Sequence, residues 1–235
     1  DSGIARGNVT LVQKGQIINA NMIEYKKDKS QDGVSYKAIG DVIIKDSTRV
    51  ATCGLAKYDR DNERTILELE PEIKENNRLL AGTKITLAYE QEKLKKLYIP
   101  KNAYAITPII GYQASSIDSN QVGDSLRFND KMEGKSLLGF FENGNLDSLR
   151  IEGMAKTLYH IFEDSIYQGK NNASGDTIAI SFYNNDLSTI YIIGGSEGKY
   201  IPDSLSDNNE YPVTYKASRI KYYLQNDESD FDGNV

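Results

Sequence analysis

The sequence contains one cysteine, one histidine and no tryptophan among its 235 residues. A single cysteine excludes an intramolecular disulfide, and we expect Cys53 to be a small, buried, unreactive apolar residue. A single histidine, His160, excludes metal sites that need several imidazole ligands. A catalytic triad built on His160 would also need a G-x-S-x-G nucleophile elbow, which the sequence lacks. We therefore expect neither catalysis, nor a bound metal, nor a cofactor.

Long apolar runs and a surplus of basic residues are also missing. No run approaches the ~18 apolar residues that a membrane-spanning helix requires, and no signal peptide is visible. The net charge of -6 argues against a nucleic-acid partner, which would require a basic surface. The chain begins at Asp1 without methionine and stops at 233–235, a strand-like segment. We therefore expect a trimmed chain whose natural protein continues beyond residue 235.

The strongest pattern is an alternation of apolar and polar residues with a period of two, which indicates half-buried β-strands. The alternating segments are rich in Ile, Leu, Tyr and Phe, which suit a pleated surface. They include residues 85–89, 126–128, 149–151 and 178–182. Clusters of Gly, Asn, Asp and Ser that are typical of turns lie between them, at 142–145, 171–176 and 184–186.

We expect helix to be scarce. Residues 88–97 have helical propensity but lie between two strands, so we interpret their Glu-Gln-Glu-Lys stretch as a charged hairpin connection. Residues 154–168 are the segment where a short helical turn is expected. Because turn compositions recur at the spacing typical of an all-β chain, the sequence predicts the all-β class.

Internal repeats indicate how the strands are organised. The pattern Leu-x-x-(Leu/Ile)-x-Ile occurs at 94–99, 146–151 and 187–192. Each copy is followed by a small residue and preceded by a segment that opens on glycine. The small residues are Ala103, Ala155 and Ser196, and the glycines are Gly82, Gly123 and Gly175. A unit of roughly 40–50 residues, with two strands separated by a polar turn, therefore recurs three times.

The repeats predict a sheet that folds over on one apolar face. Two short strands cannot bury that face alone, whereas stacked copies bury a shared one. The result is a roll or sandwich with a continuous apolar interior. We therefore expect repeated antiparallel strand pairs that form one elongated, slot-like β-jellyroll over 1–235, divisible into 1–107 and 108–235. The sequence does not decide whether the interior is an open slot or a packed core.

Two further motifs recur near the ends of the chain. Ala-x-x-Ile-x-Tyr occurs at 20–25 and 217–222, and Gly-(Asn/Asp)-Val occurs at 7–9, 40–42 and 233–235. Their order and spacing resemble the OstA-like/LptA family of periplasmic lipopolysaccharide-transport proteins of Gram-negative bacteria. In that family a strand opened by GNV leads to A-x-x-(I/L)-x-Y and returns to A-x-G-(N/D)-V.

The resemblance is clearest over residues 5–107 and returns at 217–235. The middle, 108–216, keeps the strand-pair rhythm with looser motifs. The residues that carry it are Gly7, Asn8, Val9, Ala20, Ile23, Tyr25, Ala38, Ile39, Gly40, Asp41, Val42, Ala51, Ala56, Tyr58, Asp59, Gly82, Ile85, Leu87 and Tyr89. The chain resembles either a larger OstA-like protein or the periplasmic N-terminal part of LptD.

The resemblance implies a periplasmic protein that binds lipopolysaccharide and holds the acyl chains of lipid A in its apolar interior. It also implies open edge strands at both ends of the sheet. Through these edges, copies of the chain and other Lpt-type β-jellyroll domains would join head to tail by strand addition. End-to-end self-association is therefore expected.

The expected lipid contacts are the inward-facing apolar residues of the repeated strands, each of which is equally a candidate for plain core. They are Ile23, Val42, Ile44, Ile85, Leu87, Leu97, Ile99, Leu126, Phe128, Leu149, Ile151, Ile178, Ile180, Phe182, Ile190, Ile192 and Ile220.

Two acidic groups admit a different interpretation. Residues 228–233 resemble the first half of a calcium loop, although a solvated acidic turn is the simpler interpretation. The pairs Glu70/Glu72 and Asp59/Asp61 would suit a glycosidase, but solvated charges on an outer strand face are commoner. The 16 tyrosines would stack on sugars or simply occupy half-buried sheet faces.

Three functions remain open at this point. Lipid carriage comes first, as a bridge or shuttle for lipopolysaccharide. The alternative is a structural β-solenoid or adhesin whose interior is packed and binds no lipid. A carbohydrate-active β-helix enzyme is the third, and it would need carboxylates clustered in a groove. The width and lining of the interior distinguish these functions.

Overall fold

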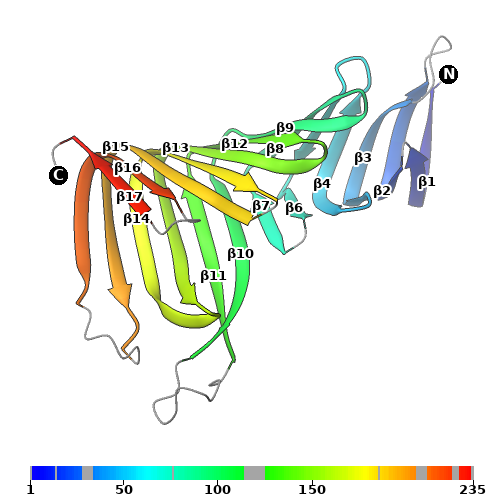
Figure 1. Cartoon of the computed structure of the whole chain (residues 1–235). Coiled ribbons are helices and arrows are strands. Elements are labelled where there is room, and N and C mark those ends of the chain that lie inside the picture. Colours follow the sequence, from blue (N-terminus) through cyan, green and yellow to red (C-terminus); the bar gives the residue numbers. More distant parts are fainter. Residues whose placement is uncertain are drawn as a thin grey trace. The chain divides into compact units, whose positions relative to one another are not determined.

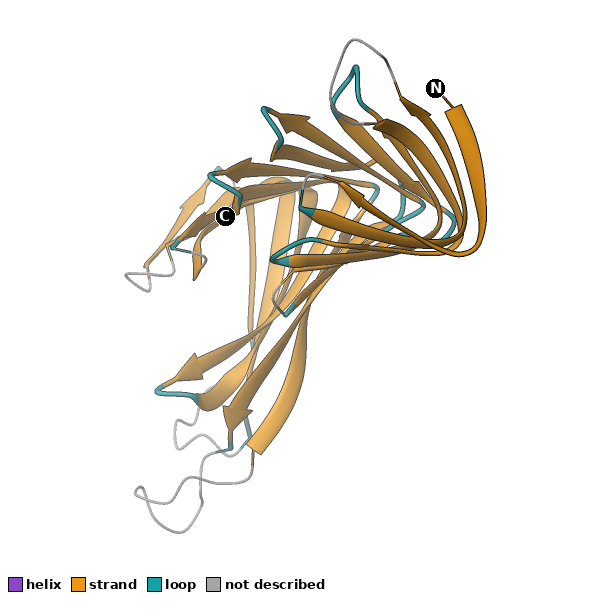
Figure 2. Ribbon diagram, turned by 90° about the vertical axis from the view of Figure 1, so that its right-hand side faces the viewer, coloured by secondary structure: helices purple, strands orange, loops and turns teal. Residues whose placement is uncertain are grey.

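The computed structural model describes residues 2–13, 15–27, 34–75, 77–113, 125–184, 186–204, 211–223 and 228–233. Those residues form strands and short turns without a helix, which confirms the predicted all-β fold (Figure 2). Within this part of the chain, accordingly, no helix could cross a membrane. The strands pair mainly antiparallel, as the sequence predicts.

The strands fall into two compact units: unit 1 contains Asp1–Tyr104 and Ser136–Leu149, and unit 2 contains Ala105–Lys135 and Arg150–Val235. Unit 1 is built from β1 (Ser2–Gln13), β2 (Gln16–Lys27), β3 (Val34–Lys45), β4 (Arg49–Asp59), β5 (Arg64–Glu68), β6 (Glu72–Glu75), β7 (Arg78–Ala81), β8 (Lys84–Glu90), β9 (Lys93–Ile99) and β12 (Ser136–Glu142). Unit 2 is built from β11 (Ser125–Gly134), β14 (Ile166–Tyr183), β15 (Asp186–Pro202), β16 (Val213–Tyr223) and β17 (Glu228–Asp232). Two strands, β10 (Ala103–Tyr112) and β13 (Asn145–Glu163), run from unit 1 into unit 2 (Figure 1).

The sheet of unit 1 has two arms joined by a bend. Each of the first four strands contributes one half to each arm, and the later, shorter strands belong to one arm alone. Arm A contains 2–6, 22–27, 34–39, 55–59, β5, β8, β9 and β12, and arm B contains 9–13, 16–20, 42–45, 49–53, β6 and β7. In Figure 2 the strands nearest the N-terminus fold back at the bend, so that the two arms face each other.

Pairs of residues with positive φ create the bend. Gly7 and Asn8 have φ of 81° and 47°, and Gly40 and Asp41 have φ of 77° and 46°. The first pair opposes a single residue of β2, Asn21, and the second lies where three residues of β3 oppose two of β2, so that each pair forms a β-bulge. Glycine, asparagine and aspartate are the residues that best tolerate this left-handed conformation. The structure therefore corrects one expectation, because Gly-Asn-Val does not open β1 but bends it in the middle.

Unit 2 contains bends of the same kind with a different sequence. Gly153 and Met154 have φ of 79° and 53°, and Gly194 and Gly195 have φ of 80° and 57°. Opposite the second pair, β16 contributes one residue, Ser218. Pairs of residues with positive φ therefore recur in unit 2 without the sequence Gly-Asn. This difference explains why the motifs become looser after unit 1.

We expect Gly40→Ala to destabilise the protein more than Gly7→Ala. Both substitutions place a side chain at a left-handed φ, which costs about 1–2 kcal/mol. A Cβ at position 40 would also lie 2.8 Å from Asn21 Nδ2, whereas a Cβ at position 7 meets no atom within 4 Å. Asn21 would then have to give up its 2.9 Å hydrogen bond to Asp41. Urea unfolding of both variants measures the difference, and equal midpoints would contradict this account of the bend.

Local predictions along the chain have mixed outcomes. Residues 88–97 form the β8–β9 hairpin with its turn at Gln91 and Glu92, as predicted. The helical turn at 154–168 is wrong, because these residues end β13, turn at Asp164–Ser165 and begin β14. The acidic turn at 228–233 is wrong as well, since Glu228–Asp232 pairs with β16. In both places the backbone hydrogen bonds of a paired strand outweigh local propensity. Asn234 and Val235 lie outside the described residues.

Candidate functional site: the interior of the bent sheet

The apolar interior of unit 1 is the first candidate site. Side chains that alternate along the strands of both arms point into it, and Ile85 in arm A and Val42 in arm B are 0% and 1% exposed. Eight of the predicted lipid contacts lie in this unit, and all of them are buried: Ile23, Val42, Ile44, Ile85, Leu87, Leu97, Ile99 and Leu149. Their role as lipid contacts stays a prediction.

Side chains of the two arms leave little space between the free ends of the arms. The cavity between the arms has a volume of ≈ 20 Å³, and Leu67, Ile73 and Leu87 contribute to its walls. Such a volume holds about one water molecule. At this end of unit 1, the two arms therefore lie close together.

A polar group, which we call the mouth cluster, lies where the free ends of the two arms meet. It consists of Gln16, Asp46, Arg49, Glu75 and Tyr89. Arg49 Nε lies 3.2 Å from Asp46 Oδ2 and 3.8 Å from Glu75 Oε1. Tyr89 of arm A is hydrogen-bonded to Gln16 of arm B. Burial raises the pKa of Glu75, and the nearby Arg49 guanidinium opposes that rise. The contact between Tyr89 and Gln16 therefore joins the two arms, whereas the ion pairs of Arg49 lie on the arm B side.

Unit 2 holds the other nine predicted residues. Six of them are buried, namely Ile151, Ile178, Ile180, Ile190, Ile192 and Ile220. The other three, Leu126, Phe128 and Phe182, are half-buried. Sequence alternation therefore identifies the buried face in both units, but it does not show how the two interiors differ.

The interior of unit 2 contains a polar network that sequence reasoning missed. Asn171, which is 5% exposed, donates from Nδ2 to Tyr159 Oη at 2.8 Å and accepts from Tyr215 Oη at 2.6 Å. The Tyr222 ring lies 6.3 Å from that of Tyr215 and 6.4 Å from that of Tyr159. Burial raises the pKa of all three tyrosines, which therefore stay neutral. The buried face of unit 2 is therefore not wholly aliphatic.

His160 takes part in a second buried group of unit 2. Its Nδ1 lies 2.8 Å from Asp130 Oδ1, and its backbone N–H donates to the same oxygen at 2.9 Å. Its ring stacks on Phe128 at a centroid distance of 4.5 Å, and Phe128 stacks in turn on Tyr167 at 4.5 Å. Burial raises the pKa of Asp130, against the effect of His160. The geometry indicates a pair that holds β11 to β13.

The acidic residues and the cysteine singled out in the sequence lie at positions that a structural role explains. Asp59 is exposed and accepts a 2.6 Å hydrogen bond from Asn62, which lowers the pKa of its carboxyl. Glu70 is exposed at a left-handed bend position. Within the described residues, no three His, Cys, Asp or Glu side chains gather in a way that could hold a metal ion. Cys53 is buried, as predicted, and burial raises the pKa of its thiol to about 11.

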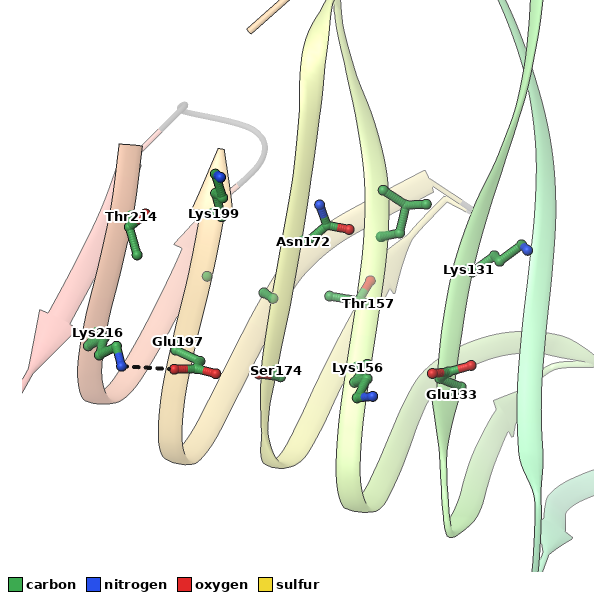
Figure 3. A pocket seen from close by; sticks show the side chains of 13 residues that line it. Lys131, Glu133, Lys156, Thr157, Asn172, Ser174, Glu197, Lys199, Thr214 and Lys216 are labelled. Atoms are coloured by element: carbon green, nitrogen blue, oxygen red, sulfur yellow. Dashed lines mark ion pairs between the residues drawn. The ribbon is translucent and has the colours of Figure 1, made fainter. Parts of the chain in front are cut away.

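A trough of ≈ 540 Å³ lies on the sheet of unit 2 (Figure 3). Side chains of β11, β13, β14, β15 and β16 line it, and most of them belong to exposed positions that alternate with buried ones such as Thr157 and Ala173. The charged and polar residues around it are Lys131, Glu133, Lys156, Asn172, Ser174, Glu197, Lys199, Thr214 and Lys216. Their two-residue spacing is visible in the sequence, but that spacing does not reveal that the five strands are neighbours.

The sheet of unit 1 bends so that two arms face each other across an apolar interior. This arrangement defines the class of β-protein to which the fold belongs. Residues 1–93 match the family model described as LptA/(LptD N-terminal domain) LPS transport protein. The matched part lies wholly within unit 1, and it belongs to this family of lipopolysaccharide-transport proteins. The resemblance drawn from the motifs is thereby confirmed for this part. No curated protein matches the chain.

Proposed function

We propose that this chain is a periplasmic lipopolysaccharide-binding protein that carries the acyl chains of lipid A in the interior of unit 1 toward the outer membrane. The observation that carries the proposal is the set of buried aliphatic side chains on two facing arms, within the part of the chain that matches the family. Burying an acyl chain there would gain about 0.8 kcal/mol per methylene group.

Lipid uptake requires the two arms of unit 1 to separate. A cavity of ≈ 20 Å³ holds no acyl chain, so the arms must move apart at their free ends before lipid fills this part of the interior. The bend joins the arms covalently along one side, while the hydrogen bond between Tyr89 and Gln16 in the mouth cluster joins their free ends. We therefore propose that the slot opens at the mouth cluster, since water can replace the hydrogen bond that joins the two arms there.

The packed interior also favours the alternative function, a structural β-protein without a lipid ligand. A measurement of lipopolysaccharide binding distinguishes lipid carriage from the structural alternative. The purified chain should bind lipopolysaccharide saturably in a fluorescence-displacement assay with an apolar dye, and free saccharide should not compete. A chain that takes up neither the dye nor lipopolysaccharide would support the structural alternative.

We also propose end-to-end association through β1. Within unit 1, β1 pairs along one edge with β2, and Figure 1 shows β1 at the end of the sheet. An open edge offers unpaired N–H and C=O groups to another strand. The ladder between β1 and β2 closes at Gln13–Gln16, with two residues between them. That closing pair exchanges backbone hydrogen bonds, so the N–H groups of Thr10 and Val12 point away from β2.

Thr10→Pro should therefore lower the average oligomer size and leave the thermal midpoint nearly unchanged. Proline removes one outward-facing donor without removing a bond to β2. Thr10→Ala is the matched control, because it also loses the 2.8 Å hydrogen bond to Asn19 but keeps the backbone N–H. Light scattering over a concentration series measures the size. A strict monomer at high concentration, or a closed dimer that the proline leaves intact, would rule out this assembly.

A further inference from the structure

We propose that Tyr36 donates a hydrogen bond to the ester or amide carbonyl through which an acyl chain is joined to its carrier. This role rests on the proposed function, because it places the acyl chain in the interior of unit 1. It adds the chemical group that the interior recognises and the residue that recognises it. Tyr36 would thereby fix how deep the chain lies between the arms.

Hydroxyl groups form a row on the inward face of arm A, close to its free end. Tyr25, Tyr36 and Tyr58 oppose one another in the register of β2, β3 and β4, and Thr65 of β5 follows Tyr58. We call these four residues the hydroxyl row. The next inward-facing row toward the bend is buried and wholly aliphatic, and it consists of Ile23, Ala38, Ala56, Leu67 and Ile85. The inner face of arm A therefore changes from polar to apolar with depth.

The hydroxyl row lies directly behind a contact between the arms. Val34 of arm A precedes Tyr36 by two residues and lies closer to the free end of β3. The side-chain amide of Gln13, in arm B, donates to Val34 O and accepts from the Val34 N–H, both at 3.1 Å. An acyl chain that enters between the free ends would therefore pass the hydroxyl row before it reaches the aliphatic row.

Tyr36 is the member of this row that can offer a donor to a ligand. Its side chain is 5% exposed, and its buried Oη has no hydrogen-bond partner among the described residues. It contacts Tyr58 through the rings, whose centroids lie 5.6 Å apart. Burial raises the pKa of Tyr36, so the hydroxyl keeps its proton. A buried donor without an acceptor destabilises the fold, and a ligand acceptor would remove that cost.

The surroundings of Tyr36 favour an uncharged acceptor. Its cross-strand neighbours in the row are tyrosines, and the row behind it is aliphatic. A carboxylate or a phosphate would lose its hydration there without gaining a counter-charge from these neighbours. An ester or amide carbonyl loses much less, and in an acyl lipid it stands at the junction between the polar carrier and the apolar chain. That junction matches the boundary between the two rows.

Two lipids that differ only in this carbonyl test the proposal: monolauroyl glycerol, an ester, and monododecyl glycerol, the corresponding ether. Each is titrated below its micelle concentration against an apolar dye bound to the intact chain. The unaltered chain should bind the ester about five-fold more tightly, as one net hydrogen bond predicts. Tyr36→Phe should bind both lipids equally, at the affinity of the ether. It should also melt at the same temperature as the unaltered chain or higher, because it loses an unpaired buried hydroxyl.

The matched control is Tyr98→Phe, which removes a hydroxyl from a side chain of unit 1 that is 43% exposed. It should keep the preference for the ester. A preference that survives in Tyr36→Phe, an equal loss in the control, or a lower melting temperature of Tyr36→Phe would each overturn the role of Tyr36. If the unaltered chain binds ester and ether equally, this role fails while lipid carriage stands. If neither lipid displaces the dye, both fail.

Discussion

Ile180→Asp should unfold the region around β14, with a loss of stability of about 4 kcal/mol or more. The Ile180 side chain is 1% exposed and pairs across the strands with Ile190, which is also 1% exposed. Aspartate there would place a carboxylate among isoleucines without a partner, and the carboxyl would have to become protonated or reach water by opening the sheet. Circular dichroism during thermal unfolding measures the loss.

Ser181→Asp provides the matched control for this prediction. Ser181 is the next residue of the same strand and is exposed, so the same charge should change stability by less than about 0.5 kcal/mol. An Ile180→Asp variant that melts with the unaltered protein but loses lipid binding would show that this position faces an open slot. That result would contradict the buried position of Ile180 in unit 2.

His160→Leu should destabilise the protein by about 3 kcal/mol, because it leaves the buried Asp130 carboxylate without its imidazole partner. The two side chains are 8% and 15% exposed, so water replaces the lost contact poorly. Leucine keeps an apolar surface against Phe128, so the effect should come from the carboxylate rather than from lost packing. Urea unfolding at neutral pH measures the loss.

The pH dependence of this loss identifies its cause. Burial already raises the pKa of Asp130, and removing His160 should raise it further. A carboxyl whose pKa is higher in the folded state than in the unfolded state destabilises the fold where it is ionised. The loss of stability caused by His160→Leu should therefore become smaller as the pH falls through that raised pKa. Asp130→Asn/His160→Leu should recover part of the stability at neutral pH, and a deficit that is the same at every pH would contradict this explanation.

Period-two alternation predicted the buried face because burial on a sheet depends on local sequence. Ile85, Ile151 and Ile192 all lie where the alternation places them, at 0% exposure. The repeated small residues Ala103, Ala155 and Ser196 are buried as well. The motifs of residues 1–93 identified the family because left-handed bends restrict residue choice, as at Gly40 and Asp41.

Other features depend on which strands become neighbours, and the sequence of a strand does not by itself reveal its neighbours. Leu69 and Glu70 adopt the same left-handed pair, with φ of 64° and 57°, although neither is a glycine or asparagine. Asn171 is hydrogen-bonded to Tyr215, which lies 44 residues away in the sequence, and neither segment has a pattern that predicts this contact. The trough likewise combines residues of five strands. The width of the interior is set by how the arms close, which alternation does not encode.

Photo-crosslinking to lipopolysaccharide shows whether acyl chains enter the interior of unit 1. A diazirine analogue of about leucine's size, placed at Leu97, would report from the interior, since that side chain is 1% exposed. The same probe at the adjacent Tyr98, which is 43% exposed, would report from the opposite face of β9. We expect an adduct with the lipid A acyl chains from position 97 and little or none from position 98. Equal labelling from both positions, or no adduct from position 97 at saturating lipopolysaccharide, would contradict it.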